Sequence, residues 1–413
     1  MKAHGIRQVL MIAFATIVAP LAAQRIATIE VELDPAATTE VPLIIHLDEI
    51  TSLPDSALTL QEVNGSKRTD VPFQISYSGS RSLHWITKTG AKQKKKVFEL
   101  VKGSPSAKVE MKASLGDGAL TLQSGATNLL RYQVNLVYPP AGIDTAYRRN
   151  GFIHPLWSPH GQELTRIQPK DHYHHYGIWN PWTHVLYKGD TVDFWNIGGK
   201  KGTVRFAGFL STTSGPVYSG FEARHEHVVT KKGARPEVAM NELLTVNTWQ
   251  PSPDYYLVDI TSKLSCATDA PVVLLEYRYG GLGWRTTGEW DNKNSEVITS
   301  DGKSRKESDG SKARWCIIQG TLGSDYGGAV MMSHPANYNH PEPLRIWPEN
   351  QYNRGDMFAN FSPTKDKDWP LEPGKSYLLR YRLVVFNGKM TKEKAEEAWK
   401  NFAGPPRITV KLN

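Results

Sequence analysis

The sequence lacks long apolar runs and the common nucleotide-binding motifs. After residue 23, no stretch has the roughly 18 consecutive apolar residues that a membrane-spanning helix requires, so we expect no membrane span. It also has no P-loop, no dinucleotide-binding fingerprint and no nucleophilic-serine elbow. These absences make nucleotide-dependent reactions and serine-elbow hydrolysis poor candidates for the function.

Cysteine is scarce as well. The chain has only Cys266 and Cys316. In an oxidising compartment they can form one disulfide, and each can equally be a buried thiol. The sequence leaves both alternatives open, because the separation of the two residues in space is not visible in it.

The first residues have the pattern of a secretory signal peptide. Lys2 and Arg7 precede an apolar run from Val9 to Val18, which small residues follow. We therefore predict a signal peptide over residues 1–23 and a periplasmic or secreted protein. The formal charge of +8 lies largely in local runs typical of solvated loops, so we expect no nucleic-acid partner.

The mature chain is long enough for two domains. Short stretches of branched and aromatic residues, separated by Pro, Asn-Gly and Ser-Gly turns, predict strands almost throughout. We expect a small β domain over residues 24–115 and a large antiparallel β-sandwich over residues 116–413. One helix is expected near the C-terminus, from Thr391 to Ala403, because Thr391 can cap it and Gly404-Pro405 ends it.

The most unusual stretch runs from residue 149 to residue 195. Six of the 13 histidines fall between His154 and His184, together with three tryptophans. Groups that titrate near neutrality beside flat aromatic faces are typical of a ligand pocket. Several Pro and Gly residues divide the stretch into turns and short strands, so it cannot be one long helix.

The block Asp171-His172-Tyr173-His174-His175 is the strongest local signal. If it is extended, His172 and His174 project to one face and His175 to the other. One interpretation is acid–base catalysis by His154, His172 and His174, with Asp171 orienting a ring and His175 binding substrate.

Two other interpretations stay open. No cofactor is predicted, but a divalent metal is possible, with His172 and His174 as ligands and His154, His225 or His227 completing the site. Alternatively, the histidines form a hydrogen-bonded lattice that only shapes the loops.

Arginine and tryptophan side chains accompany the histidines. Arg149, Arg166 and Arg285 can each hold a carboxylate or vicinal hydroxyls, although an ordinary ion pair is the commoner role of an arginine. Trp179 can stack against a sugar ring or pack in the core.

A second polar cluster follows later in the chain. His334, Asn337 and His340 lie in a short segment rich in proline and asparagine. Strands far apart in sequence often meet in a sandwich, so these residues can line the same pocket or simply build a turn.

Several motifs together resemble a known family. They are FIHPLWSPHG, the Thr165-Arg166 pair, DHYHHYGIW, VDFW, GGLGWR and SHPANYNHP. The chain is similar in these motifs to the PmoA-like domain of unknown function, a family of exported bacterial proteins. The resemblance implies a sandwich of the galactose-mutarotase-like type in proteins linked to carbohydrate breakdown. The "methane oxygenase" label of that family does not suit a chain without spanning helices.

These observations lead to three functional hypotheses. The first is an exported enzyme that acts on a sugar or glycoside by His/carboxylate chemistry, as an epimerase, lyase or hydrolase. The second is a non-catalytic glycan-binding sandwich, and the third is a His-ligated metalloprotein. In the first two cases the partner is a carbohydrate or a sugar-derived small molecule.

Overall fold

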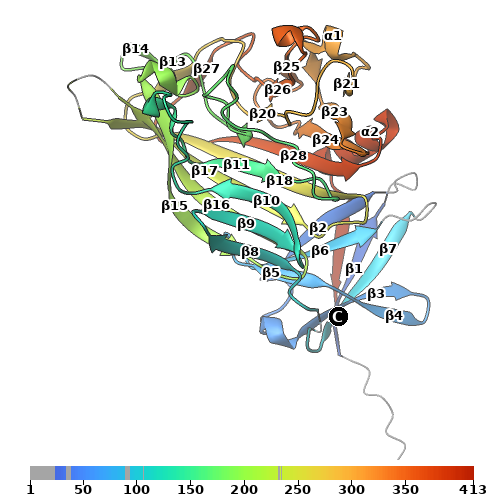
Figure 1. Ribbon diagram of the computed structural model, residues 1–413. Coiled ribbons are helices and arrows are strands. Elements are labelled where there is room, and N and C mark those ends of the chain that lie inside the picture. Colours follow the sequence, from blue (N-terminus) through green and yellow to red (C-terminus); the bar gives the residue numbers. More distant parts are fainter. Residues whose placement is uncertain (1–23, 34–38, 89–93, 106, 231–232, 234) are drawn as a thin grey trace, which may run out of the picture.

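The computed structural model describes residues 24–33, 39–88, 94–105, 107–230, 233 and 235–413. The predicted signal peptide over residues 1–23 lies outside the described residues. The described strands form five sheets (Figure 1). The pairings within the two largest sheets are antiparallel. The predicted all-β sandwich class is therefore confirmed.

The longest strands form an eight-stranded sheet. Along β17 (Glu237–Trp249), Leu244, Val246 and Thr248 are buried and the residues between them are less so, which is the two-residue period of a strand with one buried face. The strand order is β15 (Gly202–Thr213), β16 (Tyr218–Val229), β17, β18 (Tyr255–Cys266), β28 (Tyr377–Asn387), β24 (Asp325–Ser333), β23 (Trp315–Leu322), β21 (Ser295–Thr299).

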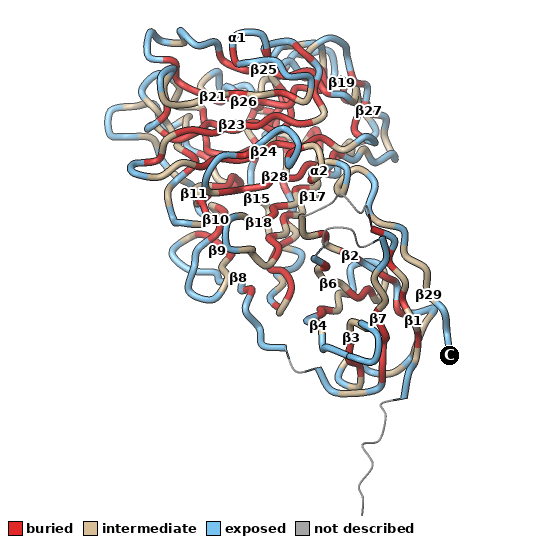
Figure 2. Tube along the Cα trace, turned by 90° about the vertical axis from the view of Figure 1, so that its right-hand side faces the viewer, coloured by how far each residue is buried: buried red, intermediate tan, exposed pale blue. Residues whose placement is uncertain are grey.

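A nine-stranded sheet of shorter strands packs against it. The strand order is β22 (Lys312–Ala313), β25 (Glu342–Ile346), β26 (Phe358–Phe361), β20 (Gly283–Arg285), β12 (Ile178–Trp179), β11 (Phe152–Leu156), β10 (Thr127–Gln133), β9 (Ala119–Ser124), β8 (Met111–Gly116). Leu122 and Ile178 from this sheet share one apolar core with Val246 and Met331 from the eight-stranded sheet. Buried residues, red in Figure 2, follow strands such as β23, β24 and β28.

A smaller sheet lies beside the sandwich near residue 185. Its strand order is β14 (Asp190–Val192), β13 (Val185–Tyr187), β19 (Val272–Leu274), β27 (Trp369–Leu371).

The N-terminal part of the chain forms two further sheets around a core of its own. The first has the order β29 (Ile408–Leu412), β1 (Arg25–Glu32), β7 (Lys95–Lys102), β3 (Leu58–Asn64), β4 (Lys67–Val71). The second has the order β2 (Glu40–His46), β6 (Ser82–Lys88), β5 (Phe73–Ser76).

The proposed domain division at residue 115 stays a prediction. Two strand pairings show to which sheets the segments near the domain boundaries belong. The C-terminal strand β29 pairs with β1, so residues 408–412 lie in the small N-terminal sheet rather than in the sandwich. In addition, β8 already pairs with β9 of the nine-stranded sheet, so the Gly116-Asp117-Gly118 segment is a hairpin turn within that sheet rather than a hinge between units.

The predicted C-terminal helix is α2 (Lys392–Ala403), and the Thr391 hydroxyl accepts a hydrogen bond from the backbone N–H of Lys394. A single helical turn, α1 (Arg305–Ser308), was not predicted. The short 3₁₀ segments are η1 (Asp55–Ala57), η2 (Thr145–Tyr147), η3 (Ile197–Gly199) and η4 (Gln351–Asn353). Within the described ranges, no helix has the length and apolarity needed to cross a membrane.

The two cysteines are free thiols. Cys316 is buried in β23, where burial raises the pKa of its thiol. Cys266 is partly buried at the end of β18 and donates to the carbonyl of Leu371. Of the two alternatives that the sequence left open, the structure has the unbridged one.

Candidate functional site

The histidine block lies on a tight loop above the middle of the nine-stranded sheet. The loop is closed by a bridge between Ile167 and Tyr176 and by a hydrogen bond from the Gln168 N–H to the His175 carbonyl (2.8 Å). Gln168 has a left-handed φ of 44°, and Pro169 accepts from the His172 N–H (2.8 Å). The block is therefore not extended, so the condition under which His175 would point to the opposite face is not met, and successive turns bring the three rings together.

His172, His174 and His175 form a compact cluster. One ring nitrogen from each lies within 4.8 Å of the others. The ring centroids are 4.6 Å apart for His172 and His175, 4.9 Å for His174 and His175, and 5.0 Å for His172 and His174. This histidine triad has a gradient of exposure, since His175 is 1% exposed while the His172 side chain keeps 19%.

An aromatic floor supports the buried end of the triad. The ring of His175 lies 5.1 Å from Phe358, 5.3 Å from Trp179 and 5.5 Å from Trp347. These rings belong to a separate apolar cluster on the outer face of the sheet. Trp179 is 3% exposed, so it packs beneath the histidines and does not offer a free face to a ligand.

The exposed end of the triad carries a carboxylate–imidazole pair. His172 Nδ1 lies 3.0 Å from Asp171 Oδ2, and Arg285 Nη2 donates to the same oxygen at 2.9 Å. The hydroxyl of Tyr352 lies 3.2 Å from His172 Nε2. Tyr352 is 47% exposed and has a left-handed φ of 52°, so its ring stands at the entrance to the pair.

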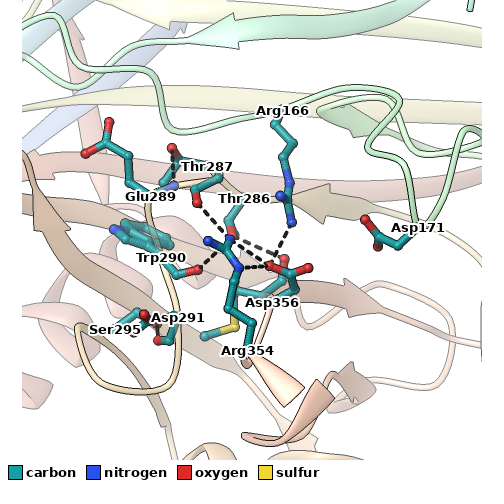
Figure 3. A network of polar contacts seen from close by, with 12 residues as sticks. Arg166, Asp171, Thr286, Thr287, Glu289, Trp290, Asp291, Ser295, Arg354 and Asp356 are labelled. Atoms are coloured by element: carbon teal, nitrogen blue, oxygen red, sulfur yellow. Dashed lines mark hydrogen bonds and ion pairs between the residues drawn. The ribbon is translucent and has the colours of Figure 1, made fainter. Parts of the chain in front are cut away.

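Charged side chains near Asp171 form a network around Asp356, and Figure 3 shows Arg166 and Arg354 reaching its carboxylate. Arg166 (3.2 Å), Arg285 (3.4 Å) and Arg354 (2.7 Å) all contact the carboxylate of Asp356. The Arg285 side chain is fully buried, and its guanidinium lies 4.5 Å from the ring centre of Trp347. Three guanidinium groups thus contact the carboxylate of Asp356, and one of them, that of Arg285, also contacts Asp171.

The pKa shifts follow from this burial and charge. Burial lowers the pKa of His174 to about 3, and the charges of His172 and Arg285 act in the same direction. Burial also lowers the pKa of His175 well below its usual value. At Asp171 burial alone raises the pKa, but the His172 hydrogen bond and the charge of Arg285 outweigh it, and the pKa lies below its usual range. Near neutrality the site therefore has an ionised Asp171 beside two neutral imidazoles.

His154, which the sequence placed with the catalytic histidines, does not join the triad. It lies on β11, where its Nδ1 is 2.9 Å from the hydroxyl of Thr165. Gly177 lies between Arg285 and His154 on neighbouring strands. Its carbonyl accepts from the Arg285 N–H, and a Cβ added to Gly177 would lie 3.1 Å from the Cβ of His154. Burial lowers the pKa of His154 to about 4.

Arg149 is behind the loop rather than in front of it. It is 2% exposed, donates to the Phe194 carbonyl and lies 5.6 Å from the ring centre of Tyr176. Burial lowers its pKa to about 10. Arg166 and Arg285 reach the carboxylates beside the triad, whereas Arg149 does not. The substrate-binding role of the three arginines stays a prediction.

His225 and His227, the other candidate metal ligands, project into the interior of the sandwich. His225 Nδ1 lies 3.2 Å from Glu242 Oε2, and its Nε2 contacts the hydroxyl of Tyr132. His227 is fully buried. The earlier expectation that one of them completes a site with His172 is wrong, because the nine-stranded sheet separates them from the loop.

The second polar cluster is a separate place in the molecule. Asn337 Nδ2 donates to Glu342 Oε1 (2.8 Å), and His334 and His340 lie against Phe402 and Trp399 of α2. Glu342 begins β25, and the triad lies at the other end of this strand, roughly 16 Å away at about 3.3 Å per residue. The prediction that His334, Asn337 and His340 line the same pocket as the triad is therefore wrong.

Sequence reasoning missed Tyr352, Arg354 and Asp356. All three come from one segment, NQYNRGD, directly before β26. The segment is polar and contains glycine, which is typical of any surface loop. The sequence carries no signal that this loop returns to the histidines.

Comparison with known proteins gives a family and a distant likeness to solved structures, of which one example follows. No curated protein matches the chain. The crystal structure of a protein in the glycosyl hydrolase family 38 from Enterococcus faecalis superposes with a TM-score of 0.43 and 7% identity. The match covers 95% of this chain but only 48% of that chain, so this protein spans about half the length of its structural neighbour. Residues 119–400 match a family described as "Family of unknown function (DUF6807)", and the chain belongs to that family.

Proposed function

We propose that this protein is an exported enzyme that acts on a sugar or glycoside by proton transfer, with His172 as the acid–base residue. The observation that carries the proposal is the Asp171–His172 pair, in which His172 Nδ1 lies 3.0 Å from Asp171 Oδ2. Arg285 donates a hydrogen bond to the same carboxylate oxygen, and both side chains of the pair are partly exposed to solvent. A carboxylate that orients an imidazole is a recurring arrangement for general acid–base catalysis.

In this proposal each ring nitrogen of His172 has a role. An ionised Asp171 accepts from Nδ1–H, which leaves Nε2 of His172 as the atom that takes and returns a proton. Asp171 then stabilises the imidazolium that forms. Arg285 holds the carboxylate in place, and its burial against Trp347 fixes its own position.

The surroundings suit a sugar. The ring of Tyr352 is exposed beside His172 and can pack against the apolar face of a pyranose. The arginines of the site favour a transition state in which negative charge develops on the substrate. Proton abstraction by an epimerase or a lyase has such a step, whereas glycoside hydrolysis passes through an oxocarbenium-like transition state with positive charge on the sugar. The relation to PmoA-like proteins stays a prediction.

A metal site is the second candidate, and the histidine triad is the observation that favours it. Three imidazoles within 4.8 Å can share one ion after small side-chain rotations, and metal ligands must be neutral histidines. His175 Nδ1 is buried without a hydrogen-bond partner among the described residues. Asp171 would then orient His172 as a carboxylate does behind a ligating histidine.

The test is turnover of a panel of plant and host glycosides, including oxidised sugars, followed by mass spectrometry. His172→Ala and Asp171→Asn are expected to lose about 10²–10⁴-fold in turnover, the usual contribution of general acid–base catalysis. His160→Ala is the matched control, because His160 pairs with Asp325 but its side chain is 55% exposed and far from the triad. Full activity in both site variants contradicts the proposal.

Elemental analysis of the purified protein separates the two candidates. If the triad holds a metal, about one ion per chain is expected in the native protein and in His160→Ala, and much less in His175→Ala. A chain without metal that still turns over substrate favours acid–base chemistry by free imidazoles.

A further inference from the structure

A hollow lies between the small N-terminal part and the sandwich, lined by residues of β5 and β16 among others. The strands β5 and β6 of the small part lie near the β8 edge of the sandwich in Figure 1. One wall comes from the three-stranded sheet of β2, β6 and β5. The other comes from the ends of β15, β16 and β17. Its volume is about 690 Å³, within the range of ordinary small-molecule sites. We call it the interdomain groove.

A buried side chain helps to fix the two walls to each other. The Gln74 carboxamide oxygen accepts from the backbone N–H groups of Val217 (3.2 Å) and Tyr218 (3.1 Å), and Gln74 is 7% exposed. Gly215 permits this contact, since a Cβ there would lie 2.1 Å from the same oxygen. A buried junction of this kind holds the groove open at a constant width, which lowers the cost of binding a ligand.

The lining is rich in hydroxyl and carboxamide groups and poor in charge. Among the described residues that line the groove, Glu222 alone carries a formal charge, apart from the two histidines. The neutral polar groups come from both walls: Ser76, Ser80, Ser82, Thr213, Thr245 and Asn247. In a chain of net charge +8, such a lining selects for a ligand that is itself uncharged and rich in hydrogen-bonding groups.

The two histidines of the groove extend this pattern. His84 Nε2 lies 2.8 Å from the Ser76 hydroxyl, and His46 Nδ1 lies 2.9 Å from the Ser80 hydroxyl. Burial lowers the pKa of His84 to about 4, so its ring is neutral and has one donor and one acceptor. Imidazole and hydroxyl pairs of this kind match sugar hydroxyls, which also donate and accept.

An aromatic side chain stands at the mouth of the groove. Tyr77 is 69% exposed, yet its hydroxyl donates to Asp55 Oδ2 at 2.7 Å. Arg81 in turn donates to Asp55 at 2.7 Å. The ring is therefore exposed and anchored at the same time, and such a ring can pack against the apolar face of a sugar at small entropic cost.

We infer that the interdomain groove binds a segment of a neutral oligosaccharide and so forms a carbohydrate site separate from the histidine triad. The inference goes beyond the proposed function and does not depend on it, because the groove shares no residue with the triad. It gives the protein a second point of attachment to a polymeric substrate.

The experiment is calorimetric titration of the full chain with neutral hexasaccharides (cellohexaose, xylohexaose, maltohexaose and mannohexaose) and with hexagalacturonate as the charged counterpart. We expect at least one neutral hexasaccharide to bind more tightly than hexagalacturonate. Tyr77→Ala is expected to weaken that binding at least tenfold, and Thr245→Trp to abolish it by filling the groove.

A matched control makes the result specific. Tyr138→Ala removes a tyrosine of similar exposure (57%) outside the groove and is expected to bind like the native protein. Absence of binding by every neutral hexasaccharide overturns the inference, as does tighter binding of hexagalacturonate. Unchanged affinity in Tyr77→Ala and Thr245→Trp also overturns it.

Discussion

Glu342 is a fully buried carboxyl whose removal gives a quantitative test of the structure. Its oxygens accept hydrogen bonds from Ser333 (2.6 Å), Asn337 (2.8 Å) and Tyr381 (3.0 Å). These bonds favour the ionised form, but burial outweighs them and raises the pKa of Glu342 to about 7 from an ordinary value of 4.5. The perturbation is Glu342→Gln, which keeps the shape and removes the titration.

The sign and size follow from linkage between proton binding and folding. Because the folded pKa lies above the unfolded one, the protonated Glu342 contributes stability that is fully present below pH 4.5 and lost as the pH rises through about 7. Each pH unit in this window changes the free energy of unfolding by about 1.4 kcal/mol, and the whole window by about 3 kcal/mol. The stability of native protein minus that of Glu342→Gln should therefore fall by about 3 kcal/mol between pH 4.5 and pH 8.

The assay is urea unfolding followed by tryptophan fluorescence at half-unit pH steps. Glu276→Gln is the control for the loss of one carboxyl elsewhere in the chain, because Glu276 is exposed in the loop after β19. Parallel pH profiles for native protein and Glu342→Gln would refute the reasoning, since they would mean that Glu342 titrates alike in the folded and unfolded chain.

Two other expectations follow from the fold. Gly177→Ala should destabilise the protein by more than about 3 kcal/mol, because φ is +57° and the new Cβ would lie 2.2 Å from the Ile153 carbonyl oxygen. Gly142→Ala, with positive φ but nothing within 4 Å, should cost about 1 kcal/mol, and equal midpoints in urea would contradict this difference. Thiol titration should find two free thiols in the denatured chain, with Cys316 protected in the native protein; a mass two units lower before reduction would show a disulfide instead.

The strands and the helix were predictable because they depend on local patterns. In β17 the buried residues alternate as the sequence pattern indicates, and α2 begins at the capping residue Thr391 that the sequence predicts. Hydrophobic period and caps act over a few residues, so one sequence is enough to show them. The pairing of β29 with β1 was not visible in local patterns, because the two strands lie at opposite ends of the chain.

The site was predictable in part. The histidine block and Arg285 were found from composition and motif, and the structure brings Asp171, His172 and Arg285 together. The shape of the histidine loop was not predictable, because Gln168 has a left-handed φ and glutamine is not a residue type typical of that conformation.

The more distant partners were beyond prediction for another reason. Asp356 reaches the site only because β26 pairs with β20, and that register is a long-range property of the fold. The sequence pattern indicated a polar cluster at His334, Asn337 and His340. The length of β25 separates this cluster from the triad.

The closing of the first sheet by the last strand determines the order in which the protein can be completed. Strand β1 is synthesised early and pairs with β7 along one edge. Its other edge has no partner until residues 408–412 have been synthesised. The sandwich has all of its strands before that moment, so the part of the molecule nearest the start of the chain is the last to be finished. A chaperone that covers the free edge of β1 during this interval would act on a strand whose pairing partner is synthesised nearly 380 residues later, on the order of the whole chain.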